Sequence, residues 1–74
     1  MLSKPDVARQ ISDLMMDIFT RVHQSVEMVQ QTCSADEAAR YRKATAKVVG
    51  AVVMDVLEPL YEKNPSLKPP NWDG

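Results

Sequence analysis

Cysteine, histidine and glycine are scarce in this sequence, and each shortage excludes a kind of site. The 74 residues include one cysteine, Cys33, and one histidine, His23, which rules out an internal disulfide and a zinc site of the Cys/His type. Two glycines, one of them the last residue, cannot build a glycine-rich phosphate loop. A chain this short buries only about 60% of the surface that it exposes when unfolded. A partner subunit is therefore the stabilising device that we expect.

The sequence also lacks a charge excess and a long hydrophobic segment. Its formal net charge is -1, whereas nucleic-acid-binding domains usually carry a basic excess, so the composition argues against a nucleic-acid partner. The longest apolar run, residues 48–54, is far shorter than the roughly 20 residues of a membrane-spanning helix. The N-terminal residues contain no apolar segment typical of a signal peptide, and the cysteine is single. We therefore expect a cytoplasmic protein with no membrane partner.

Helical periodicity is the main pattern that is present. Between about residues 4 and 32 an apolar residue recurs at every third or fourth position, which predicts an amphipathic helix. The recurring series consists of Val7, Ile11, Leu14, Ile18, Val22, Val26 and Val29, and Cys33 continues it directly after the predicted helix. Ser3 and Asp6 have the spacing of a capping box, and this pattern predicts the start of the helix. Cys33, at the end of the apolar series, is expected to be a small buried residue.

A second helix is predicted over about residues 35–58. Ser34 and Glu37 have the spacing of a complete capping box, which indicates a new helix start. Because the link between the two helices is so short, they must fold back on each other as an antiparallel hairpin. One unbroken helix is the alternative, but it would leave the capping pattern without a role.

The C-terminal part of the sequence contains most of the prolines. Pro59 is expected to kink or end the second helix, and residues 59–64 are expected to form one short turn. Residues 1–64 therefore form the predicted helical hairpin. Residues 65–74 are rich in proline and are expected to form an extended tail.

Antiparallel folding also predicts ion pairs between the two helices. Glu27 would lie near Arg40, and Arg9 would lie near Glu58. Each exposed pair is worth about 1 kcal/mol or less, so these pairs would support the hairpin rather than stabilise it strongly.

The second half of the second helix is apolar on almost every side. A lone hairpin buries only one stripe of this helix, so the remaining apolar surface predicts self-association. Two hairpins would form an antiparallel four-helix bundle, and this all-α homodimer is the predicted fold; a tetramer would cover the same surface. The expected interface residues are Lys47, Val49, Gly50, Val52, Val53, Asp55, Val56 and Leu57.

The order of charges in the second helix predicts how two copies would align. Apart from the capping acids Asp36 and Glu37, basic residues come first and acidic residues last, which opposes the helix dipole. If two copies of this helix packed antiparallel about an axis near Ala51, Lys47 would face Asp55 of the partner subunit. Arg40 would likewise face Glu62 of the partner subunit. The simpler alternative is that these charges form an ordinary solvated face.

Three side chains suggest an alternative function, a ligand-binding or metal-binding bundle with possible enzymatic activity. His23 and Glu27 are one helical turn apart, and two such pairs could hold a metal if two copies met. Asp55 lies in the most apolar stretch, where a buried carboxylate could act as an acid or base. A solvent-facing or paired side chain explains each of them more simply. We therefore assign no catalytic residue, metal or cofactor.

The function that we expect is a non-catalytic homodimer that acts as a protein-interaction or regulatory module. Met16, Met28 and Trp72 lie off the main apolar stripe or in the tail, and they are candidate contacts with another protein. A second alternative is a small nucleic-acid-binding protein that uses a basic strip on the second helix. The residues of this basic strip are Arg40, Arg42, Lys43 and Lys47.

Overall fold

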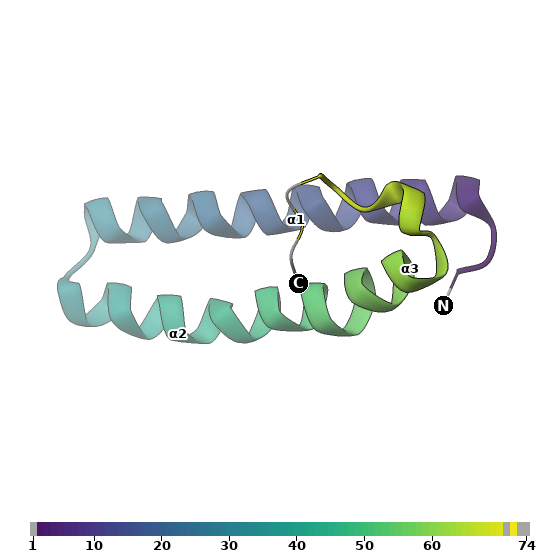
Figure 1. The fold of residues 1–74 in the computed structure, drawn as a ribbon. Helices are drawn as coiled ribbons and strands as arrows, with labels where there is room; N and C mark the ends of the chain where they lie inside the picture. The colour runs from purple at the N-terminus through teal and green to yellow at the C-terminus, as the bar shows by residue number, and fades with distance from the viewer. Residues whose placement is uncertain (1, 71, 73–74) are drawn as a thin grey trace.

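The computed structural model describes residues 2–70 and 72, and in this part of the chain every regular element is helical (Figure 1). The helical segments in chain order are α1 Pro5–Thr32, α2 Ala35–Ala51, the π-helical segment η1 Val52–Leu57, α3 Glu58–Lys63 and the 3-10 turn η2 Pro65–Leu67. α1 and α2 lie antiparallel and pack against each other, which confirms the predicted helical hairpin. None of the helices in the described residues combines the length and the hydrophobicity that a membrane crossing requires.

The turn between α1 and α2 contains the capping box that the sequence predicts. The Ser34 hydroxyl accepts a hydrogen bond from the Glu37 backbone N–H at 3.1 Å, and Glu37 Oε1 accepts one from the Ser34 backbone N–H at 3.5 Å. The prediction that Cys33 is buried is wrong, because its side chain is exposed. Cys33 is the C-cap of α1 and has an extended backbone, so it no longer continues the inward face of the helix.

The start of α1 differs from the prediction. The helix begins at Pro5 with Lys4 as its N-cap, and no side chain caps it, so the predicted capping box of Ser3 and Asp6 does not form. A residue that precedes proline is restricted to extended backbone, and Lys4 has φ -86° and ψ 115°. Lys4 therefore takes the N-cap position, one residue after Ser3.

The core lies at the end of the hairpin where α1 begins and α3 ends. Ala8, Leu57 and Leu60 are fully buried there, and Tyr61 is 4% exposed. Partly buried side chains surround them, namely Leu2, Ile11, Met15, Met16, Val52, Leu67 and Trp72. Most of the apolar burial of the chain is therefore concentrated at this α3 end.

The inward face of α1 is centred on small residues rather than on the most hydrophobic ones. Ala8 and Ser12 are buried, whereas Val7 is 40% exposed and Leu14 is 48% exposed, contrary to the predicted stripe. The small side chains leave room for Tyr61, whose phenolic oxygen lies 2.7 Å from Ser12 Oγ in a buried hydrogen bond. The volume of Tyr61 thus determines which face of α1 turns inward.

The second helix does not end at Pro59. Proline lacks an N–H donor, and its ring would collide with the carbonyl four residues earlier in a regular α-helix. Directly before Pro59 the backbone widens into η1, where the Glu58 N–H donates to the carbonyl of Val53. The helical path then continues through α3 to Lys63.

Asn64 ends α3 and connects it to the N-terminal segment. Its side-chain amide donates to the carbonyl of Leu2 at 2.9 Å and to that of Leu60 at 3.1 Å. After Asn64 the predicted extended tail begins with the 3-10 turn η2 rather than with extended chain. Residues 71, 73 and 74 of the predicted tail lie outside the described residues.

The Ser12–Tyr61 hydrogen bond provides a test of this core. Replacement of Tyr61 by Phe (Tyr61→Phe) leaves the buried Ser12 hydroxyl without its partner, and we expect the free energy of unfolding to fall by about 1–2 kcal/mol. Urea unfolding at a fixed protein concentration measures this loss. The matched control is Tyr41→Phe, which removes the exposed 2.8 Å bond to Ser25 and should cost less than about 0.5 kcal/mol. Equal losses in the two variants would contradict this description of the core.

Candidate functional site

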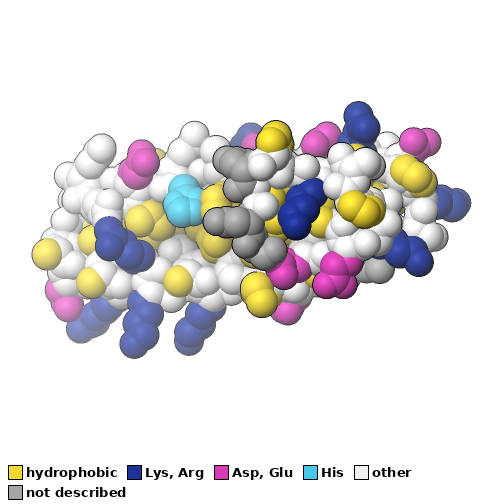
Figure 2. All heavy atoms as spheres, viewed as in Figure 1, with side chains coloured by type: hydrophobic (Ala, Val, Ile, Leu, Met, Phe, Trp, Pro, Cys, Tyr) yellow, Lys and Arg dark blue, Asp and Glu magenta, His cyan; other side chains and the backbone are white. Residues whose placement is uncertain are grey.

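An open hollow lies between α1 and α2 beyond the core, and we call it the groove. It has a volume of about 640 Å³. Its apolar lining consists of Val22, Val26, Ala46, Val49, Gly50, Val53 and Met54. Its polar lining consists of His23, Glu27, Gln30, Arg42 and Thr45. Figure 2 shows hydrophobic side chains in this hollow, with the histidine beside them in cyan.

The groove exists because two helices alone cannot enclose the apolar faces that they present. The consecutive segments α2, η1 and α3 form the second helical path of the hairpin. Val22 and Val26 from α1 are only partly buried, and so are Val49 and Val53 from the second helical path. Met54 is 62% exposed although it lines the groove. A concave apolar surface of this kind is typical of a binding site for a protein or for an apolar ligand.

The predicted interface residues fall into three groups in the structure. Val49, Gly50 and Val53 line the groove. Lys47 and Asp55 are exposed and do not line it, whereas Val52 and Val56 are partly buried. Leu57 is fully buried within its own hairpin, so it has no surface left for a partner and must be removed from the predicted set.

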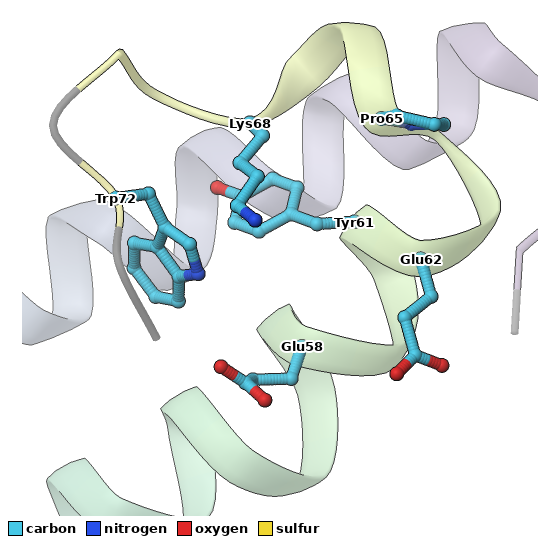
Figure 3. Close-up of a pocket in the computed structure, with 6 residues that line it drawn as sticks. All are labelled: Glu58, Tyr61, Glu62, Pro65, Lys68 and Trp72. Atoms are coloured by element: carbon cyan, nitrogen blue, oxygen red, sulfur yellow. The ribbon is translucent and has the colours of Figure 1, made fainter.

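A second hollow, which we call the acidic pocket, lies between α3 and the tail and has a volume of about 340 Å³ (Figure 3). Its lining residues are Glu58, Tyr61, Glu62, Pro65, Lys68 and Trp72. The Trp72 ring meets Tyr61 edge-on, with ring centroids 5.2 Å apart. Figure 3 shows the Glu58 carboxylate on the side of the pocket toward Trp72. The pocket therefore combines two acidic side chains and one lysine with two aromatic rings.

The Glu58 side chain in this pocket has a carboxylate oxygen that needs a hydrogen-bond donor. Its Oε1 atom is buried and accepts no hydrogen bond from the described residues. An unsatisfied buried acceptor costs about 1–3 kcal/mol. The predicted pairing of Glu58 with Arg9 therefore does not satisfy this oxygen, and Arg9 lines a separate hollow beside Ser12 and Asp13.

The residues of the predicted basic strip lie in different surroundings in the structure. Arg40 pairs with Asp36 one helical turn earlier, at 3.2 Å, instead of with the predicted Glu27. Arg42 lines the groove, whereas Lys43 and Lys47 are exposed away from it. Figure 2 shows basic side chains projecting from the lower edge of the molecule near the α1–α2 turn.

The predicted protein-contact residues also lie in different surroundings. Met28 is 64% exposed, whereas Met16 is partly buried against the core. Trp72 packs against Tyr61 of its own chain. No sequence pattern indicates this docking directly, although the small residues Ala8 and Ser12, spaced one turn apart, indicate where a large side chain could pack.

The side chains considered for chemistry are mostly exposed. His23 is exposed and packs on Phe19, with ring centroids 4.5 Å apart, and it lines the groove together with Glu27. Asp55 is exposed rather than buried in apolar surroundings. Among the described residues, no three His, Cys, Asp or Glu side chains gather closely enough to hold a metal ion.

Comparison with known proteins identifies no relative: no family model, no curated protein and no solved structure matches this chain. The groove and the acidic pocket are therefore the features on which a function can be based. Both are suited to binding, since one is an open apolar surface and the other is an acidic recess with aromatic walls.

Docking of the tail on Tyr61 provides a second test. Replacement of Trp72 by alanine removes a partly buried ring from the core, and we expect the free energy of unfolding to fall by on the order of 2 kcal/mol. Chemical denaturation followed by circular dichroism measures the change. Lys68→Ala, at an exposed position in the same tail, should change the stability by less than about 0.5 kcal/mol. If Trp72→Ala had as small an effect, the ring would not contribute to the core.

Proposed function

We propose that this protein is a non-catalytic interaction module that acts as a homodimer, with two hairpins packed groove against groove as a four-helix bundle. The observation that supports this proposal is the groove itself, an apolar hollow of about 640 Å³ along the middle of a very small protein. The fully enclosed core lies to one side of it and contains few large side chains. A second copy that covered the groove would therefore bury apolar side chains that a single hairpin leaves partly exposed.

A second copy fits the dimensions of the hairpin. The described chain measures 44 × 19 × 15 Å, so the outline of its broad face is on the order of the area that one partner buries in a standard interface. A stable interface of standard size buries about 800 Å² on each partner. A two-fold interface must also be complementary to itself, and a groove between two antiparallel helices meets this requirement when it faces an identical groove.

Dimerisation would leave other features for contact with a further protein. Met28 and the exposed side chains of the basic strip, Lys43 and Lys47, do not line the groove. An exposed methionine adapts to varied apolar partners, and exposed lysines attract acidic ones. These surfaces support a regulatory or scaffolding role for the dimer.

The second candidate function is that of a small-molecule carrier. The volume of the groove lies within the range of ligand pockets, and Arg42 and His23 could contact an anionic group on an apolar ligand. Native mass spectrometry of the purified protein distinguishes the two functions. A ligand retained at one per chain would favour the carrier, whereas a ligand-free species at twice the chain mass of 8.3 kDa would favour the dimer.

Self-association through the groove can be tested with two methionines of nearly equal exposure. Met54→Glu places a charge on the groove, and we expect the dissociation constant of the dimer to rise at least about tenfold. Met28→Glu is the matched control, because Met28 is 64% exposed and Met54 is 62% exposed, but only Met54 lines the groove. Light scattering on a sizing column, over a dilution series, measures both.

Both variants should remain helical by circular dichroism, since neither side chain is buried in the hairpin. A wild-type protein that stays monomeric at about 100 μM would overturn the proposed function. An equal effect of the two substitutions would place the interface elsewhere on the hairpin.

A further inference from the structure

A row of side chains along the second helical path is complementary to itself when reversed. Arg42, Ala46, Gly50, Met54 and Glu58 recur at every fourth residue. The first four line the groove, and the last lines the acidic pocket. Gly50 is the middle residue of this row. The basic Arg42 and the small Ala46 precede it, and the large Met54 and the acidic Glu58 follow it. An antiparallel copy would therefore match basic with acidic, and small with large.

The π-helical segment η1 gives the two ends of this row a similar direction. In a regular α-helix, Arg42 and Glu58 would point about 160° apart around the axis. The wider turn of η1 takes up about one extra residue, which turns everything after it back by roughly 100°. By this geometry Arg42 and Glu58 point within roughly 60° of each other around the axis, at opposite ends of the row.

Among the described residues, the two charged ends of the row, Arg42 and Glu58, form no salt bridge. The salt bridges between described side chains are Arg21–Asp17 and Arg40–Asp36. Neither includes Arg42 or Glu58, and the buried Oε1 of Glu58 receives no hydrogen bond from the part of the chain that the structure describes. A planar guanidinium donates paired hydrogen bonds to a carboxylate and also stacks on aromatic rings. The acidic pocket, with Tyr61 and Trp72 beside Glu58, has the chemistry to receive it.

The packing of the described residues does not require a glycine at position 50. A Cβ atom built at this position meets nothing within 4 Å, so the space in front of it is open. Glycine is among the least favourable residues in the interior of a helix, and it is useful where another backbone must approach closely. Gly50 lies at the middle of the row, where the second helical paths of two antiparallel copies would cross.

We propose that two chains associate about a two-fold axis at Gly50, with Arg42 of each chain bound to Glu58 of the partner subunit in the acidic pocket. This pairing rests on the proposed homodimer and names its contacts. It differs from the alignment based on sequence alone, in which Lys47 faces Asp55 of the partner subunit. Lys47 and Asp55 do not line the groove, whereas the row containing Arg42 and Glu58 borders it and the acidic pocket.

A charge exchange tests the pairing, with the dissociation constant measured by light scattering over a dilution series. We expect Arg42→Glu and Glu58→Arg each to raise the dissociation constant at least about tenfold. The double variant, which restores opposite charges, should return to within about threefold of the wild type. Arg40→Glu is the matched control, because Arg40 is exposed and paired with Asp36, and it should change the constant less than about threefold.

Cross-linking at the axis supplies an independent measurement. In a Cys33→Ser background, Gly50→Cys should form a disulfide-linked dimer under mild oxidation, because residues on a two-fold axis lie close to their own copies. Ala39→Cys, exposed on the same helix and outside the groove, should remain monomeric on a non-reducing gel.

The outcomes separate the pairing from the dimer itself. A monomeric wild type overturns both the proposed function and this inference. A dimeric wild type without charge rescue and without the Gly50→Cys cross-link overturns the pairing alone. Rescue by Lys47→Glu combined with Asp55→Lys would instead support the alignment about Ala51.

Discussion

Tyr61 is the side chain that joins the separate parts of this small protein. Its ring fills the space left by Ala8 and Ser12 on α1, and its hydroxyl is bonded to Ser12 at 2.7 Å. The other side of the ring meets Trp72 of the tail. Tyr61 belongs to α3, which has 6 residues, and so short a helix is not stable alone in water. The position of α3 therefore depends on tertiary packing. Tyr61 therefore fixes α3 on α1 and, through the tail, forms one wall of the acidic pocket.

The helices and their turn could be predicted from sequence because the signals are local. Apolar spacing and the Ser34–Glu37 capping box act within a few residues of the chain. The inward face of α1 was not predictable from hydrophobicity, since Leu14 is more hydrophobic than Ser12 and yet more exposed. That choice depends on Tyr61, far away in the sequence. Pro59 was expected to kink or end the helix, whereas the helical path continues through a widened turn directly before it. That outcome depends on the packing of α3 against α1, which local sequence patterns do not report.

The candidate site was predictable in part for the same reason. The apolar run indicated that Val49, Gly50 and Val53 would face something other than their own hairpin, and they line the groove. The acidic pocket could not be foreseen, because Glu58 is placed there by the π-helical turn and enclosed by a tail whose docking has no periodic pattern. Local patterns thus located the apolar surface, while its charged border required the three-dimensional structure.

The charge order of the second helical path can be understood as a consequence of unequal burial along the hairpin. Apart from the capping acids Asp36 and Glu37, this path carries its basic residues in α2 and its acidic residues in η1 and α3. That order opposes the helix dipole, which carries a modest cost in an isolated helix. The α3 end has an enclosed core whose packing offsets the cost of a buried carboxylate oxygen, whereas the half near the turn has little core of its own. In the proposed pairing, each α3 end would receive Arg42 from the weakly packed half of the partner subunit. The well-packed end of one chain would then stabilise the poorly packed end of the other, and an order that is unfavourable in one helix would be favourable in two.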